Sequence, residues 1–432
     1  MPDAYHSGVA GRFGGAGVRK WVIGVFVCWL TLTVIAVPTR QRPVDRSGAG
    51  GAPSGARVVL NNSLDTLASP ALGAVHVLQR YDLLKTAHGT AFVYGAGLTV
   101  PFGAVLVLLV VRWRLHHRTR RTRAHADPPD LARRRLLIDG AAIGAGLAMA
   151  STPVYAAAIE PNTITVRRYR VPIKGLPGSL DGLRIVQISD THLGPRVHES
   201  HIAASVRIAL EQRPDVVALT GDYVHDGPAG IDRAAELFEP LTSDSGVIGV
   251  VGVLGNHDWY ADGPRMRDAL RAIGVRMVDN DRVFLSASSR SLASSPPARP
   301  DDALCFVGLG DLLTHTVEPA RAFSGIDPDT PRVLLAHVPD TLELPGVRAP
   351  DGPRIDLALS GHTHGGQIRV PLLGTPGVPS QYGQRYAGGL IDASIAATAC
   401  PAVVSRGIGV SIVPVRFGVP PEVVVIELST EI

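Results

Sequence analysis

The sequence predicts an α/β domain preceded by membrane-spanning helices. Short apolar runs alternate with polar or amphipathic stretches from about residue 166 onward, which is typical of an α/β fold. Long uncharged windows occupy the part of the chain before residue 160. Apolar residues make up 45% of the 432 residues and charged residues 19%, which excludes a chain that is disordered throughout. We therefore divide the chain into a membrane region, residues 1–160, and a second domain, residues 161–432.

Three uncharged windows are candidate membrane spans, at residues 21–39, 89–111 and 140–159. A helix needs about 20 apolar residues to cross a bilayer, and the first two windows meet that requirement. The third window is rich in Ala, Gly and Ser, so a small-residue linker or a buried helix is its alternative. The arginine run at residues 133–135 before it also fits a twin-arginine export signal, in which case the domain is released rather than anchored.

The distribution of arginine predicts the orientation of the membrane region. Nine arginines and two aspartates lie between Arg112 and Arg135, a local charge of +7 in a chain whose total is +4. Cytoplasmic loops are enriched in Lys and Arg, so this cluster is expected inside and the domain after residue 160 outside the cytoplasmic membrane. The prediction is a multi-pass protein of the cell membrane. A nucleic-acid-binding segment is the alternative, disfavoured because the cluster lies between two apolar windows, and we expect no nucleic-acid partner.

The second domain contains candidate strands and helices in alternation. The expected strands are residues 183–189, 215–220, 247–254, 303–309, 332–336, 355–360 and 422–428, and the expected helices are residues 200–212, 231–238 and 264–273. The Ser- and Pro-rich stretch at residues 286–300 is expected to form a surface loop. Cys305 and Cys400 could pair in an oxidising compartment, and the sequence leaves that question open.

Polar residues with metal-ligating ability follow five of the expected strands. They are Asp190 and His192, Asp222, Asn256 with His257 and Asp258, His337, and His362 with His364. Ligand sites of α/β folds lie at the carboxyl ends of the strands. Residues two apart in an extended chain point to the same side, so the first and last of these pairs are each expected to reach one site.

The types of these residues predict a metal centre. Carboxylate, amide and imidazole groups together suit Mn, Zn or Fe. Seven candidate ligands exceed what one open metal site needs, but they fit two metals that share a carboxylate. Glycines 221, 255 and 361 each precede a motif residue and are expected to allow sharp turns there.

Several other polar residues receive less specific interpretations. His198, His201, His225 and His315 are expected to be structural, as most single histidines are. Tyr382, Arg385 and Tyr386 lie in a Gly-rich segment that either touches the substrate or forms a surface loop.

The ordered series Asp190-x-His192, Gly221-Asp222, Gly255-Asn-His-Asp258, His337 and Gly361-His-Thr-His364 resembles the calcineurin-like metallophosphoesterase superfamily. The segment GHTHGGQIRVP and the tail SRGIGVSIVPVRFGVPPEV are similar to its bacterial membrane-anchored or exported branch. The resemblance implies a four-layer α/β/β/α sandwich. It also implies a metal-dependent phosphoester hydrolase in which two metals activate a hydroxide, and it favours a phosphodiesterase that acts on a cell-envelope or lipid-linked phosphoester.

The resemblance also implies a role for each motif residue. Asp190, His192, Asp222 and His364 would bind the first metal (Mn, Fe or Zn), and Asp222, Asn256, His337 and His362 the second. His257 would act at the leaving-group oxygen as general acid or oxyanion stabiliser, and Asp258 would hold His257 or its loop. Three positions after Asp222 the family commonly has an acidic residue. This chain has His225 there, for which we expect only a local structural change.

Two alternatives stay open. The domain could be a non-catalytic membrane receptor that has the same fold and binds metal or phosphate. It could also be a phosphomonoesterase or a protein phosphatase, because the choice of ester depends on loops around the site.

Overall fold

A computed structural model describes residues 154–431, except 226, 349, 351, 372, 373 and 412. It also describes residues 133, 137, 140, 144, 151 and 152. The candidate spans 21–39 and 89–111 lie outside these residues, and the candidate span 140–159 lies partly outside them. No helix within the described part is long and apolar enough to cross a membrane. The membrane spans and their orientation therefore remain predictions.

Two β-sheets form the frame of the domain. The first has the strand order β1 (Thr165–Pro172), β13 (Glu422–Ser429), β2 (Arg184–Ile188), β3 (Val216–Leu219), β4 (Gly249–Gly252) and β5 (Arg276–Met277). The second has the order β11 (Gly389–Ile391), β12 (Ala402–Val404), β10 (Leu357–Ser360), β9 (Arg332–Leu335), β8 (Ala303–Gly308), β6 (Asp281–Ser286) and β7 (Ser291–Ala293). Strands β2 to β5 are parallel in the first sheet, and β8, β9, β10 and β12 are parallel in the second.

The two sheets pack face to face over one apolar core. Ile185 and Val216 of the first sheet belong to the same buried cluster as Phe306, Leu335 and Leu359 of the second. Strands β3, β8 and β9 are buried along their whole length, because the opposite face of each sheet is covered as well.

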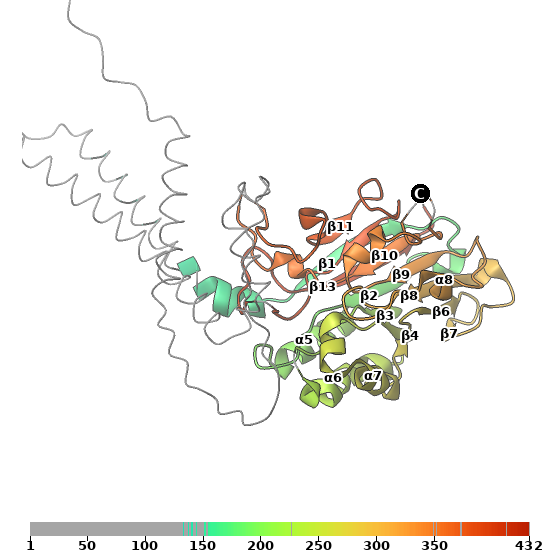
Figure 1. Ribbon diagram of the computed structural model, residues 1–432, viewed down its shortest axis with the longest axis horizontal. Coiled ribbons are helices and arrows are strands. Elements are labelled where there is room, and N and C mark those ends of the chain that lie inside the picture. Colours follow the sequence, from blue (N-terminus) through green and yellow to red (C-terminus); the bar gives the residue numbers. More distant parts are fainter. Residues whose placement is uncertain are drawn as a thin grey trace, which may run out of the picture. The chain divides into compact units, whose positions relative to one another are not determined.

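The outer faces of the two sheets are covered differently. Helices α5 (Glu199–Glu211), α6 (Ile231–Ser243) and α7 (Asn256–Ala272) lie together beside β2, β3 and β4 (Figure 1). Phe238 and Met266 of these helices belong to the same buried apolar cluster as Leu219 of the first sheet. On the second sheet, Leu334 belongs to a buried cluster with Tyr386 and other residues from short 3-10 turns, loops and the four-residue helix α8 (Pro319–Ala322). The fold is thus mixed α/β with two sheets at its centre.

All seven expected strands and all three expected helices are present. Helix α7 begins at Asn256, eight residues earlier than expected, so the Asn-His-Asp motif forms its first turn. The structure adds six strands, namely β1, β5, β6, β7, β11 and β12. Four of these (β5, β7, β11 and β12) have only two or three residues, and β1 is an arginine-rich edge strand with several exposed side chains. These five strands give no clear apolar pattern in the sequence, whereas β6 contains three consecutive buried apolar residues that the sequence analysis did not assign to a strand.

The expectation of a plain surface loop at residues 286–300 was wrong in part. Ser291–Ala293 forms strand β7, which pairs antiparallel with β6. Leu292 of this strand packs against the core between the sheets. A short hairpin strand with one large apolar residue gives no clear pattern among the serines and prolines around it.

Candidate metal centre

Five loops carry the candidate ligands to one edge of the two sheets. Each loop follows the carboxyl end of a strand: β2, β3 and β4 in the first sheet, and β9 and β10 in the second. Backbone hydrogen bonds join neighbouring loops, from Asp190 N to Gly221 O (2.9 Å) and from Gly361 N to His337 O (2.9 Å). The loops therefore hold their side chains in fixed positions relative to one another.

One cluster of ligand atoms comes from the loops after β2 and β10. Asp190, His192 and His364 are buried, and their ligand atoms lie within 4.8 Å of one another. Nε2 of His192 is 2.9 Å from Nε2 of His364, and that atom is 3.4 Å from Oδ1 of Asp190. Two imidazole nitrogens and one carboxylate oxygen thus converge on one point, as the ligands of a metal ion do.

A second cluster comes from the loops after β3, β9 and β10. Asp222, His337 and His362 have ligand atoms within 4.8 Å of one another. Nδ1 of His337 lies 2.7 Å from the carbonyl oxygen of Thr220 and donates its proton there, which leaves Nε2 without a proton in the neutral ring. His337 Nε2 is 3.2 Å from Oδ2 of Asp222.

The Asp222 carboxylate joins the two clusters. Its Oδ2 is 3.5 Å from His192 Nε2 in the first cluster and 3.2 Å from His337 Nε2 in the second. A carboxylate between two sets of imidazoles is the arrangement that a bridging ligand of a two-metal site requires.

Buried polar atoms without hydrogen-bond partners indicate where ions would bind. Eleven side-chain atoms of the described residues are buried without such a partner, and three of them are Asp190 Oδ2, Asn256 Oδ1 and His337 Nε2. An unsatisfied buried polar atom is costly unless a ligand completes it. All three belong to candidate ligands, so the residues present fit two divalent ions. The mixed oxygen and nitrogen ligand set is compatible with Mn, Fe or Zn.

Burial keeps most of the imidazoles neutral. It holds the pKa of His192 and of His364 well below the ordinary value, and burial together with the nearby His337 lowers the pKa of His362 to about 3. A neutral imidazole is the form that ligates a metal.

The remaining charges of the metal-free site are balanced by protons. Burial raises the pKa of Asp190 to about 6, with His337 opposing and Asp222 adding to the shift. Burial alone would lower the pKa of His337, but the Asp222 and Asp190 carboxylates raise it to about 10. Without an ion, the buried carboxylates thus retain a proton on His337, and a divalent cation would replace that positive charge.

The ligand pairs depend on an unusual backbone conformation. Five of the seven candidate ligands have left-handed φ angles: Asp190 (54°), His192 (48°), Asp222 (57°), His362 (67°) and His364 (50°). The paired residues lie beyond the ends of β2 and β10, so they do not share a face of an extended strand as expected. Positive φ is uncommon for residues other than glycine and is concentrated at functional sites.

The three motif glycines are required for two different reasons. Gly221 has φ +94°, and a Cβ there would lie 2.6 Å from the backbone nitrogen of Gly255. Gly255 and Gly361 do not have positive φ, so the expected sharp turn is not why they are glycine. A Cβ on Gly255 would collide with the Asp222 carboxylate, and one on Gly361 with Ser189 and Asp190. These two positions need glycine because ligand side chains pack directly against the backbone.

His257 lies at the rim of the two clusters with one ring nitrogen fixed. Its Nδ1 lies 2.7 Å from the carbonyl oxygen of His225 and donates to it, and its backbone nitrogen donates to Asp222 Oδ1 at 2.8 Å. Its ring centroid is 4.7 Å from that of His192. Because Nδ1 is occupied, Nε2 is the nitrogen that can exchange a proton.

Asp258 contacts the backbone of the ligand loops. Its Oδ2 accepts hydrogen bonds from the backbone nitrogens of Asp222 (2.8 Å) and Gly255 (2.9 Å). Its Oδ1 accepts from those of Tyr223 (2.8 Å) and Val224 (3.3 Å). These four hydrogen bonds hold the loop that carries Asp222, which is one of the two roles expected for Asp258.

His225, which was expected to be a structural histidine, lies beside the two ligand clusters. It stacks on His257, with ring centroids 5.2 Å apart and an angle of 16° between the planes, and its Nδ1 is 3.4 Å from Nδ1 of His192. The sequence did mark this position, because His225 replaces the acidic residue that the family commonly has three positions after Asp222. His198, His201 and His315 do have structural contacts, at the start of α5, with the Ile408 carbonyl and with the Trp259 ring.

The segment that contains Tyr382, Arg385 and Tyr386 has its own set of contacts. Arg385 and Tyr386 both bond to Glu343, and Tyr382 packs edge-on against Tyr386, which favours the structural interpretation of this segment. Cys305 and Cys400 are buried and free.

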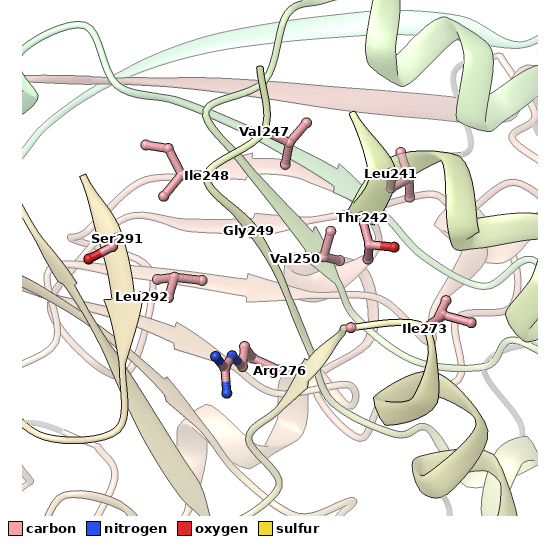
Figure 2. Close-up of a pocket in the computed structure, with 11 residues that line it drawn as sticks. Leu241, Thr242, Val247, Ile248, Gly249, Val250, Ile273, Arg276, Ser291 and Leu292 are labelled. Carbon is pink, nitrogen blue, oxygen red and sulfur yellow. The ribbon is translucent and has the colours of Figure 1, made fainter. Parts of the chain in front are cut away.

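A pocket of about 320 Å³ lies at the amino-terminal end of β4, between Leu241, Ile273 and Leu292 (Figure 2). Its lining contains no Asp, Glu, His or Cys, and Arg276 is its only ionisable residue. The pocket therefore lacks the metal-ligating side chains of the two clusters. It also lies at the other end of β4, because the clusters follow the carboxyl ends of the strands.

Comparisons with known proteins agree with this geometry. A family model described as calcineurin-like phosphoesterase matches residues 183–366. A Danio rerio transmembrane protein with metallophosphoesterase domain is 33% identical over 220 residues, 49% of this chain and 46% of that protein, so the match spans about half of that relative.

Two bacterial proteins match over more of their length. The phosphodiesterase YaeI of Escherichia coli (strain K12) is 29% identical over 305 residues, 69% of this chain and 99% of YaeI. The UDP-2,3-diacylglucosamine pyrophosphatase LpxG of Chlamydia trachomatis is 30% identical over 261 residues, 51% of this chain and 75% of LpxG. The chain belongs to the calcineurin-like phosphoesterase family.

Proposed function

We propose that this protein hydrolyses phosphoester bonds with the help of two divalent metal ions. The observation that carries the proposal is the Asp222 carboxylate, shared between two clusters of buried ligands beside His257. Asp190, His192, Asp222 and His364 would hold one ion, and Asp222, Asn256, His337 and His362 the other. When bound, the ions would supply Lewis-acid activation of the phosphoryl group and of water.

The protein side chains would contribute proton transfer and orientation. His257 would give a proton to the leaving-group oxygen, or stabilise its charge, through Nε2, because Nδ1 is fixed on the His225 carbonyl. Asp258 would act as a positioning residue, since its four backbone hydrogen bonds tie the start of α7 to the loop that carries Asp222.

The proposed substrate is a phosphodiester or phosphoanhydride of the cell envelope, one that is lipid-linked. The relatives named phosphodiesterase and UDP-2,3-diacylglucosamine pyrophosphatase support this class. The uncharged windows near the amino terminus and the relatives named transmembrane proteins support attachment to a membrane, with the catalytic domain outside the cytoplasm. We expect no nucleic-acid partner.

The activity is tested with the full chain in detergent, stripped of metal and assayed with Mn, Zn, Mg or no addition. Bis-p-nitrophenyl phosphate serves as the diester and p-nitrophenyl phosphate as the monoester. The proposal expects turnover only after metal is added, with the diester preferred. Binding of two ions without turnover of either ester would favour the receptor alternative, and a preference for the monoester would favour a phosphomonoesterase.

The first prediction concerns His257. His257→Ala should lower diester turnover by about 10²- to 10⁴-fold, the usual contribution of a general acid. Bound metal, measured by mass spectrometry, should stay at the wild-type level because His257 is not among the seven ligands. His315→Ala, which changes a histidine that stacks on Trp259, is the matched control and should retain full activity. Unchanged turnover in His257→Ala would remove His257 from the mechanism.

The second prediction concerns protons. Metal uptake should release protons, because ions must displace the proton of His337, whose pKa is raised to about 10, and below about pH 6 also that of Asp190, whose pKa is raised to about 6. Apparent Mn affinity should thus rise about tenfold per pH unit between roughly pH 6 and 8, because one proton is exchanged for one ion. Calorimetry in buffers of different ionisation enthalpy measures this release, and an affinity independent of pH would contradict it.

The third prediction concerns Asp258. In Asp258→Asn, the amide NH₂ would face backbone N–H groups in either orientation, since both carboxylate oxygens accept only from such donors. Metal affinity should fall by about 10- to 100-fold, as when groups that support metal ligands are lost. Asp268→Asn on α7 is the control and should bind metal as the wild type does. Wild-type affinity in Asp258→Asn would show that the loop does not depend on this carboxylate.

A further inference from the structure

The residues at the end of the third uncharged window pack against the domain that carries the ligands. Tyr155–Ile159 forms one helical turn, and Glu160 follows it directly. Ala156 of this turn is 9% exposed and Glu160 is 2% exposed. A buried carboxylate is costly unless other groups bond to it, so the contacts of Glu160 indicate what this segment does.

The segment holds the backbone at and after Arg416. The backbone nitrogen of Arg416 donates to the carbonyl oxygen of Ala156 at 2.9 Å. The Glu160 carboxylate accepts the backbone N–H groups of Gly418 at 3.0 Å and Val419 at 2.5 Å. Each oxygen of the carboxylate accepts one of these two bonds, so both are used to fix the tail of the chain.

The side chain of Arg416 is completely buried and bonds to backbone carbonyls. Its Nη1 donates to Val419 O at 3.0 Å, and its Nη2 donates to Arg406 O at 2.8 Å and to Gly407 O at 3.2 Å. Its Nε donates to Gly409 O at 3.1 Å. The planar guanidinium, which has donors on all three nitrogens, is thereby held in one position.

Carboxylates balance the buried charge of Arg416. Burial lowers its pKa to about 10, and the carboxylates of Asp190, Glu422 and Glu160 oppose this shift. Arg416 therefore stays charged at neutral pH. Glu160 thus supports Arg416 in two ways, through the backbone bonds and through its negative charge.

Arg416 lies behind two candidate ligands of the first cluster. Its Nη2 is 3.4 Å from Nδ1 of His364, whose Nε2 faces the other ligands. The backbone nitrogen of Gly409 donates to the carbonyl oxygen of Asp190 at 2.7 Å, and a Cβ on Gly407 would lie 2.6 Å from Cβ of Asp190. Both glycines have carbonyls that bind Arg416, so Arg416 contacts His364 directly and supports Asp190 through this loop.

We infer that Arg416 is a positioning residue for the first ligand cluster and that Glu160 holds Arg416 in place. The inference rests on the two-metal site of the proposed function. It gives the tail SRGIGVSIVPVRFGVPPEV a task at the metal site, and it makes the end of the window at 140–159 part of the support of that site. A domain released by cleavage would then have to keep Glu160 in order to bind the first ion tightly.

The experiment measures the affinities of the two ions separately. The full-length protein in detergent is stripped of metal and titrated with Mn by calorimetry. Asn256→Ala, which changes a candidate ligand of the second ion only, identifies the binding step that belongs to that ion. The other step reports on the first cluster.

Arg416→Lys should lower the affinity for the first ion by about 10- to 100-fold, because lysine keeps the charge but lacks the planar fork that reaches several carbonyls. Glu160→Gln should lower the same affinity by at least about threefold, because a side-chain amide can accept only one of the two backbone N–H groups. In both variants the affinity for the second ion should stay within about threefold of the wild type, as expected for a support of the first cluster.

Two kinds of control separate positioning from a general loss of stability. Arg207→Lys and Glu211→Gln change an exposed ion pair of α5 and should leave both affinities unchanged. Leu292→Ala removes an apolar contact between the sheets and should lower the melting temperature without changing either affinity.

If circular dichroism shows that Arg416→Lys does not fold, Glu160→Gln decides, because it leaves Arg416 in place. Wild-type affinity for the first ion in Glu160→Gln, or equal weakening of both ions in the two variants, overturns the inference. Failure of the proposed function is distinct, because it would appear in the wild type itself, as binding of fewer than two ions or as binding of both without turnover of either ester.

Discussion

The Asp222 carboxylate is the group on which the geometry of the whole site depends. Its Oδ2 lies between His192 and His337, which belong to different ligand clusters, and its Oδ1 accepts the backbone N–H of His257. The backbone of the same residue donates to Asp258. One residue therefore connects the loops after β2, β3, β4 and β9, and movement of this loop would displace both clusters together.

This arrangement is costly for the fold, and the surrounding structure stabilises it. Two buried carboxylates repel each other, and five ligands have left-handed backbone conformations that cost about 1–3 kcal/mol each. The two sheets that carry the loops share one apolar core, so the strand ends are held at a fixed separation. At Gly255 and Gly361 the neighbouring side chains pack so closely against the backbone that a Cβ atom would collide with them. Metal binding would offset part of this free-energy cost, because the ions would bind buried ligand atoms that have no hydrogen-bond partner in the protein.

The sequence was sufficient to predict the main strands and the set of residues that meet at their ends. Long buried strands such as β2 and β8 have clear apolar runs, and the motif residues directly follow such runs. The backbone conformation of the ligand pairs was not predictable, because Asp and His adopt left-handed angles more often than other non-glycine residues but still do so uncommonly. The place of His225 was also missed. It arises from the contact between the loops after β2 and β3, which are about thirty residues apart in the chain.

The most direct test of the account is anomalous diffraction from crystals of the protein loaded with Mn. Two Mn peaks about 3.5–4 Å apart are expected, both within bonding distance of the Asp222 carboxylate. One peak should be completed by Asp190, His192 and His364, and the other by Asn256, His337 and His362. A single peak, or two peaks that do not share Asp222, would contradict the central claim that this carboxylate joins two metal sites.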